Sequence, residues 1–174
     1  MWTKTKQIME KRLAESLKGR VTYNYSQRTT KHHGSVMKAF HIHVDKKTWY
    51  ATNLQAYTAI QCAHDELIEN LDDDRGYWEK YNATEDEAES IALKREGLVD
   101  EYTVPRYLHE YLNVCSIDDC MSGKNYFLYM LGILEHRTGK RRIEKMFRNI
   151  YSEPEWIRKF ILLRAGAEGL IVTE

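Results

Sequence analysis

The chain has 174 residues, equal numbers of acidic and basic side chains, and a hydrophobic fraction of 43%. This length and composition predict a single globular domain over residues 1–174 with a substantial core. Only two prolines and nine glycines are present, which argues against a disordered or low-complexity protein.

The zero net charge hides a strong polarity along the chain. Residues 1–50 carry eleven Lys and Arg against three Asp and Glu, whereas residues 65–101 carry four against fourteen. A dedicated nucleic-acid binder normally has an overall basic excess, so this balance favours pairing within the molecule. The acidic segment can equally offer a surface to a basic partner protein.

The cysteines and the apolar runs indicate where the protein resides. Cys62, Cys115 and Cys120 have no disulfide-rich spacing, which favours reduced thiols in a cytoplasm. The N-terminal segment lacks the apolar core of a signal peptide, and the longest near-apolar run, 126–134, is about half a membrane span. We therefore expect a cytoplasmic protein that does not span a membrane.

The N-terminal third predicts a helix followed by a small sheet. Met9, Leu13 and Leu17 recur at steps of four, which predicts a helix over 2–18 with Gly19 just beyond its end. Apolar and polar residues then alternate along 21–26 and 39–44, and a third extended segment follows at 47–52. The prediction is an antiparallel β-meander over 21–52.

The remainder, 53–169, predicts a helical body. Thr84 and Glu87 have the spacing of a capping box, which predicts that a helix begins there and ends at Gly97. The run 126–134 is apolar on all sides, as expected of a buried central helix. The expected fold class is α+β: an N-terminal helix, a three-stranded antiparallel meander and a mostly helical body.

Four of the seven histidines fall within "KHHGSVMKAFHIHV", residues 31–44. On the second of these strand segments, 39–44, His41 and His43 share a face, and that face lies opposite the core-facing residues Phe40, Ile42 and Val44. The pair is a weak candidate for a metal site, with His32 or His33 contributed by the turn. No carboxylate or cysteine has a recognisable ligand spacing with them, so exposed imidazoles are the favoured interpretation.

Other motifs do not assign a catalytic residue or a cofactor. His64 lies on the apolar stripe of its predicted helix, where a histidine usually satisfies a core polar group. "NLDDDRG" at 70–76 alternates like a calcium loop, but Arg75 and Tyr81 stand where that loop needs Gly and Glu. Nucleophile-elbow, dinucleotide and kinase motifs are absent from the sequence.

A basic cluster is the remaining candidate for binding. Lys140, Arg141 and Arg142 are predicted to begin a helix, where cations oppose the helix dipole. With Arg137 they form a candidate site for an anion or a nucleic acid. Their partner can also be internal, such as Glu168.

Two parts of the sequence carry a resemblance to a known family. "WTKTKQIMEKRLAESLKGR" near the N-terminus, and "LEHRTGKRRIEKM" with "EPEWIRKFILLRAGAEG" near the C-terminus, resemble a family of small uncharacterised bacterial proteins. The resemblance implies a bacterial cytosolic protein and assigns no catalytic residue.

By elimination, the sequence favours a non-catalytic module that binds another bacterial protein, of the accessory or antidote type. Binding of nucleic acid through the basic patches is the alternative, and a metal-dependent hydrolase using His41 and His43 is the third hypothesis. The sequence leaves the oligomeric state open.

Overall fold

The structure is a computed structural model that describes residues 2–29, 36–52 and 55–170. Its elements follow the order α1 (Trp2–Arg12), the 3-10 turn η1 (Glu15–Leu17), β1 (Val21–Thr29), β2 (Val36–Val44), β3 (Lys47–Ala51), α2 (Gln55–Glu69), α3 (Tyr77–Glu96), α4 (Thr103–Asn113), α5 (Ile117–Cys120), α6 (Tyr126–Leu134), α7 (Lys140–Arg148), the 3-10 turn η2 (Ile150–Ser152) and α8 (Glu155–Ala167). The predicted α+β class, with its N-terminal helix, meander and helical body, is confirmed.

The three strands form one antiparallel sheet in the order β1-β2-β3. Val21 pairs with Val44 at one end of the β1–β2 ladder. Asp45 and Lys46 both have positive φ in the tight turn between β2 and β3, the conformation that a two-residue hairpin of type I′ requires. Phe40, Ile42 and Val44 are buried, as the alternation predicted.

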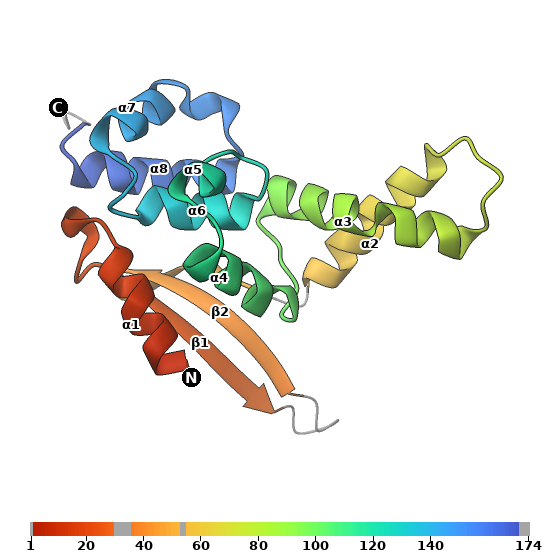
Figure 1. Ribbon diagram of the computed structural model, residues 1–174, viewed down its shortest axis with the longest axis horizontal. Coiled ribbons are helices and arrows are strands. Elements are labelled where there is room, and N and C mark those ends of the chain that lie inside the picture. Colours follow the sequence, from red (N-terminus) through yellow and green to blue (C-terminus); the bar gives the residue numbers. More distant parts are fainter. Residues whose placement is uncertain (1, 30–35, 53–54, 171–174) are drawn as a thin grey trace.

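Helices cover the apolar face of the sheet (Figure 1). Trp2 of α1 contacts Phe40 edge to face, and Phe40 also lies 5.5 Å from Phe127 of α6, measured between ring centroids. Helix α6 is buried from Phe127 to Leu134, which confirms that this apolar run is the central helix. Hydrophobic burial around α6 is therefore the main stabilising contribution to the body.

Two arginines from distant elements cap the ends of α4 and α6. Arg12 of α1 donates to the carbonyl oxygens of Tyr111 and Leu112, at 2.7 and 2.9 Å. Arg164 of α8 is buried and donates to the carbonyl oxygens of Leu134, Glu135 and Thr138 just beyond α6. The carbonyls of Tyr111 and Leu112 have no partner within α4, so Arg12 satisfies them. Arg164 adds donors to three carbonyls, two of which also accept main-chain N–H groups, from Ala14 and Thr138.

Two helix boundaries differ from the sequence prediction. The first helix ends at Arg12 and not at residue 18, because Leu13 pairs with Glu135 and Ala14 N–H donates to the Leu134 carbonyl oxygen. The predicted helix start at Thr84 is wrong, because α3 begins at Tyr77 and carries Thr84 in its buried interior. The predicted stop at Gly97 is confirmed, with φ of +73°.

Helices α2 and α3 form a hairpin, residues 55–96, which we call the arm. Figure 1 shows the arm projecting from the body, with the loop between its two helices at the far end. In the part of the chain that the structure describes, no helix is both long and apolar enough to cross a bilayer. Cys62, Cys115 and Cys120 are free thiols.

Candidate functional site

The interface between the two helices of the arm is built mostly from small side chains. The buried residues of α2 and α3 are Ala56, Ala63, His64, Thr84, Ala88, Ala92 and Leu93, of which Leu93 belongs to the main hydrophobic core. Alanine lets the helices approach closely but buries little apolar area, so the interface gains less hydrophobic free energy than the body does. A buried imidazole therefore has a large influence on the stability of this narrow interface.

His64 and Thr84 form the polar link across this interface. The Thr84 hydroxyl donates to the Lys80 carbonyl oxygen at 3.0 Å, and its oxygen lies 3.0 Å from His64 Nδ1. Because the hydroxyl proton is used on the carbonyl, Nδ1 carries the imidazole proton and Thr84 accepts it. His64 Nε2 is buried and has no hydrogen-bond partner among the described residues.

The environment of His64 disfavours the charged form of its ring. Burial lowers its pKa from the ordinary value of 6.5, and the nearby charges of Glu85 and Asp65 oppose that shift. Desolvation is the larger effect, because protonation would place an unpaired N–H inside the interface. This confirms the interpretation of His64 as a partnered core residue.

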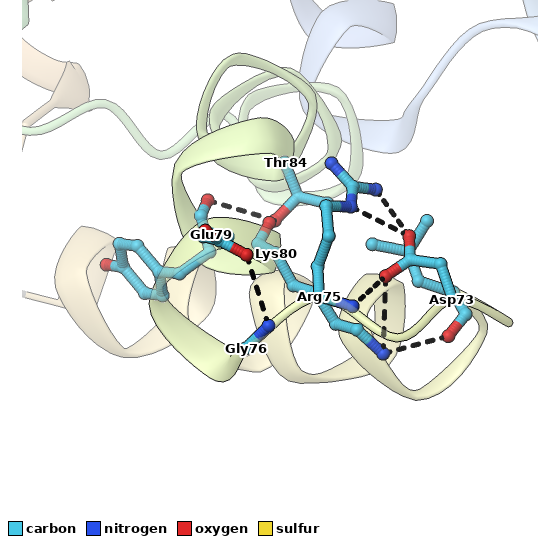
Figure 2. Close-up of polar contacts among 8 residues, drawn as sticks. Asp73, Arg75, Gly76, Glu79, Lys80 and Thr84 are labelled. Atoms are coloured by element: carbon cyan, nitrogen blue, oxygen red, sulfur yellow. Dashed lines mark hydrogen bonds and ion pairs between the residues drawn. The ribbon is translucent and has the colours of Figure 1, made fainter.

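Ion pairs and main-chain contacts order the loop at the far end of the arm (Figure 2). Arg75 Nε donates to Asp73 at 2.9 Å, and Lys80 lies 3.7 Å from the same carboxylate. The hydrogen bond from Arg75 is the main reason that the pKa of Asp73 falls to about 2. The Gly76 N–H donates to the Glu79 carboxylate, which positions the first turn of α3.

Large aromatic side chains next to this loop are exposed. Trp78 is 71% exposed and Tyr77 is 48% exposed, both in the first turn of α3. Their rings pack edge to face with centroids 5.3 Å apart, and the half-buried Tyr81 lies within 5.8 Å of Trp78. Exposed aromatic rings at the tip of a projecting hairpin are typical of protein-binding surfaces.

The exposed surface of the arm is strongly acidic. Residues 55–96 contain twelve Asp and Glu against four Lys and Arg. All four cations have partners within the molecule: Arg75 and Lys80 pair with Asp73, Arg95 pairs with Glu66, and Lys94 lies over the ring of Tyr126. The exposed carboxylates of the arm for which the structure gives neither an ion pair nor a hydrogen bond are Glu69, Asp72, Asp74, Glu85, Asp86, Glu87 and Glu96.

The structure places His41 and His43 side by side on the sheet face opposite the core. Their rings are parallel to within 6°, with centroids 5.8 Å apart. Ser26 Oγ lies 3.0 Å from His41 Nε2, and Thr48 Oγ1 lies 3.1 Å from His43 Nδ1. His32 and His33 lie outside the described residues. In the described ranges, no three His, Cys, Asp or Glu side chains gather as a metal site would require.

The predicted basic cluster makes several contacts within the molecule. Arg137 pairs with the buried carboxylate of Glu135, and Arg142 pairs with Asp118 at 2.6 Å. Lys140 Nζ donates to the main-chain carbonyl of Glu168, the internal partner that the sequence suggested, at 2.8 Å. Arg141 is exposed. Nucleic-acid binding by these residues stays a prediction.

The aromatic tip was missed in the sequence, although a signal for it is present. "GYWEKY" at 76–81 contains three aromatic residues, which span about one and a half helical turns. The surrounding segment is otherwise dominated by charged residues. The sequence shows the acidic character of 65–101, but a helix that begins at Thr84 would place Tyr77, Trp78 and Tyr81 in the preceding loop. Correctly placed on one helix, they form a single cluster.

Comparison with known proteins identifies the family. The model of the SF0329 protein family matches residues 1–165, so the chain belongs to that family. The match includes both stretches that carried the resemblance, up to residue 165. No curated protein and no solved structure matches the chain.

Proposed function

We propose that this member of the SF0329 protein family is a non-catalytic module of the bacterial cytoplasm that binds a basic partner protein through its α2–α3 arm. The observation that carries the proposal is the combination, on one projecting hairpin, of exposed aromatic rings and unpaired carboxylates. The sequence resemblance supports the bacterial and cytoplasmic parts of the proposal, and the accessory or antidote type is proposed by elimination.

The negative charge of the arm favours a partner protein with a basic surface. The cations of the arm are already engaged, so its uncompensated carboxylates can bind Lys and Arg on another molecule without first breaking an internal ion pair. Complementary charge steers association and disfavours acidic partners. The exposed aromatic rings supply apolar contact area, which the surrounding carboxylates alone do not provide.

A capture experiment with a charge-neutral arm tests the proposal. The substitutions Glu85→Gln, Asp86→Asn and Glu87→Gln remove three exposed carboxylates from α3 and leave the buried Thr84 and Ala88 in place. We expect the wild-type chain to retain a stoichiometric basic protein from its native lysate at moderate salt, and the neutral-arm variant to lose it.

The matched control carries Arg141→Gln and Lys145→Gln on the exposed side of α7. We expect this control to retain the partner. If capture instead depends on the α7 substitutions, or if the captured species is a nucleic acid, the alternative of binding through basic patches replaces the proposal. Capture that is equal in the wild type and the neutral-arm variant contradicts it as well.

A further inference from the structure

We propose that the ring cluster of Tyr77, Trp78 and Tyr81 is a binding site for an arginine side chain of the partner. The inference rests on the proposed function, to which it adds the chemical group recognised at the tip of the arm. Three aromatic rings within 6.2 Å of one another, in an acidic surrounding, form the site.

Residues of α2 hold the ring cluster in place. Tyr81 stacks on the buried imidazole of His64, with ring centroids 3.9 Å apart and planes within 11°. Gln61 Nε2 makes a long hydrogen bond of 3.5 Å to the hydroxyl of Tyr77. Two of the three rings are therefore anchored to α2, which lowers the conformational entropy lost when a ligand binds.

Trp78 is the open part of the site. At 71% exposure its indole presents ring surface to solvent, and indole is the best of the aromatic side chains for binding a cation. In the described part of the chain, no Lys or Arg lies over Tyr77, Trp78 or Tyr81, because the nearby Arg75 and Lys80 are held by Asp73. The rings are thus available to a cation from another molecule.

The charges and the shape around the rings favour arginine. Asp65 follows His64 on α2 and Glu85 lies one turn beyond Tyr81 on α3, and both carboxylates are exposed. The cluster is an open surface and not an enclosed cage. A planar guanidinium can stack on an open ring and donate to an adjacent carboxylate at once, whereas a strongly hydrated ammonium gains less there.

The test uses a short acetylated peptide with one arginine, and matched peptides with citrulline or lysine in its place. The four Trp indole N–H resonances are followed by NMR, and Trp78→Phe assigns the one of interest. We expect the arginine peptide to shift the Trp78 resonance, the lysine peptide to shift it less, and the uncharged citrulline peptide to leave it unchanged.

Substitutions complete the test. Trp78→Ala is expected to weaken binding of the arginine peptide about two- to fivefold, which is the range for a cation–π contact at an exposed site. Tyr151→Ala removes another highly exposed ring, 85% exposed and far along the chain on η2, and is expected to have no effect.

The outcomes separate this inference from the proposed function. Equal binding of the arginine peptide to the wild type and Trp78→Ala, or equal shifts with the citrulline peptide, overturns the ring site. Capture of a basic partner that still depends on Glu85, Asp86 and Glu87 would then leave the proposed function standing. Loss of that dependence overturns the proposed function itself.

Discussion

The imidazole of His64 stacks on the ring of Tyr81 inside the arm, and its Nδ1 lies 3.0 Å from the Thr84 hydroxyl on the same helix as Tyr81. This contact joins the interior of the hairpin to the aromatic cluster on its surface. We therefore expect a change in the protonation of His64 to alter the packing of Tyr81.

The arm should lose stability on acidification. Burial lowers the pKa of His64 below 6.5 in the folded arm, so below about pH 6.5 the unfolded arm binds a proton that the folded arm does not. The free energy of unfolding of the arm consequently falls as the pH drops through this region. Hydrogen exchange of the α2 and α3 amides, corrected for intrinsic rates, measures the effect.

His64→Gln is the control for that pH dependence. Glutamine can still donate a hydrogen bond toward Thr84 but does not titrate. We expect the variant to show a clearly smaller loss of arm protection between neutral pH and acid. The same pH dependence in the variant and the wild type would assign the effect to other groups, such as the carboxylates of α3.

A second prediction concerns local stability at neutral pH. The arm buries mainly alanines, whereas α6 is surrounded by large apolar side chains. Amides of α2 and α3 should therefore exchange through local opening, faster than those of α6. Equal protection in both regions would show that the arm unfolds only together with the body.

Gly97 at the end of α3 should not tolerate a side chain. Its φ is +73°, and a β-carbon there would lie 2.7 Å from the indole ring of Trp156. We expect Gly97→Ala to lower the free energy of unfolding by roughly 2–3 kcal/mol, measured by chemical denaturation. Gly19→Ala is the matched control, because Gly19 has φ of +80° and open space around it.

The comparison of these two glycines separates the cost of the left-handed backbone conformation from the cost of the steric clash with Trp156. Gly19→Ala should be destabilising by about 1 kcal/mol, the cost of the left-handed conformation alone. The difference between the two variants then measures the collision with Trp156. If both variants lose the same stability, the close approach of the indole contributes nothing.

Arg164 should be essential to the body. It is buried and donates to three carbonyl oxygens beside the end of α6, so Arg164→Leu removes these hydrogen bonds and leaves the Thr138 carbonyl oxygen without its donor. We expect a loss of about 3 kcal/mol in the free energy of unfolding. Arg12→Leu, on a half-buried arginine with the same capping role at α4, should cost less, and the reverse order would contradict this account.

The sequence predicted the architecture well because periodicity reports burial directly. The alternation around Phe40 and Ile42 and the apolar run 126–134 both had large side chains to bury, and both were confirmed. The start of α3 was mispredicted because Thr84 and Glu87 match a capping pattern, while the hydroxyl of Thr84 instead contacts His64 on another helix. That contact depends on tertiary structure and has no local signal.

The candidate site was harder to predict for a related reason. Its acidic character is visible in composition, but the exposure of Tyr77 and Trp78 depends on the arm projecting from the body. Sequence alone treats an aromatic residue in a helix as a core residue by default. The four basic residues from Arg137 to Arg142 drew attention in the sequence, yet three of them contact groups within the molecule.

The most direct test of the account is the affinity of the captured partner for the wild-type chain and for the neutral-arm variant, measured by titration calorimetry at low and high salt. We predict that the dissociation constant of the variant at low salt is at least about ten times larger than that of the wild type. The difference should be smaller at high salt, because salt screens exposed charges. Equal affinities of the two proteins at low salt would contradict docking through the arm.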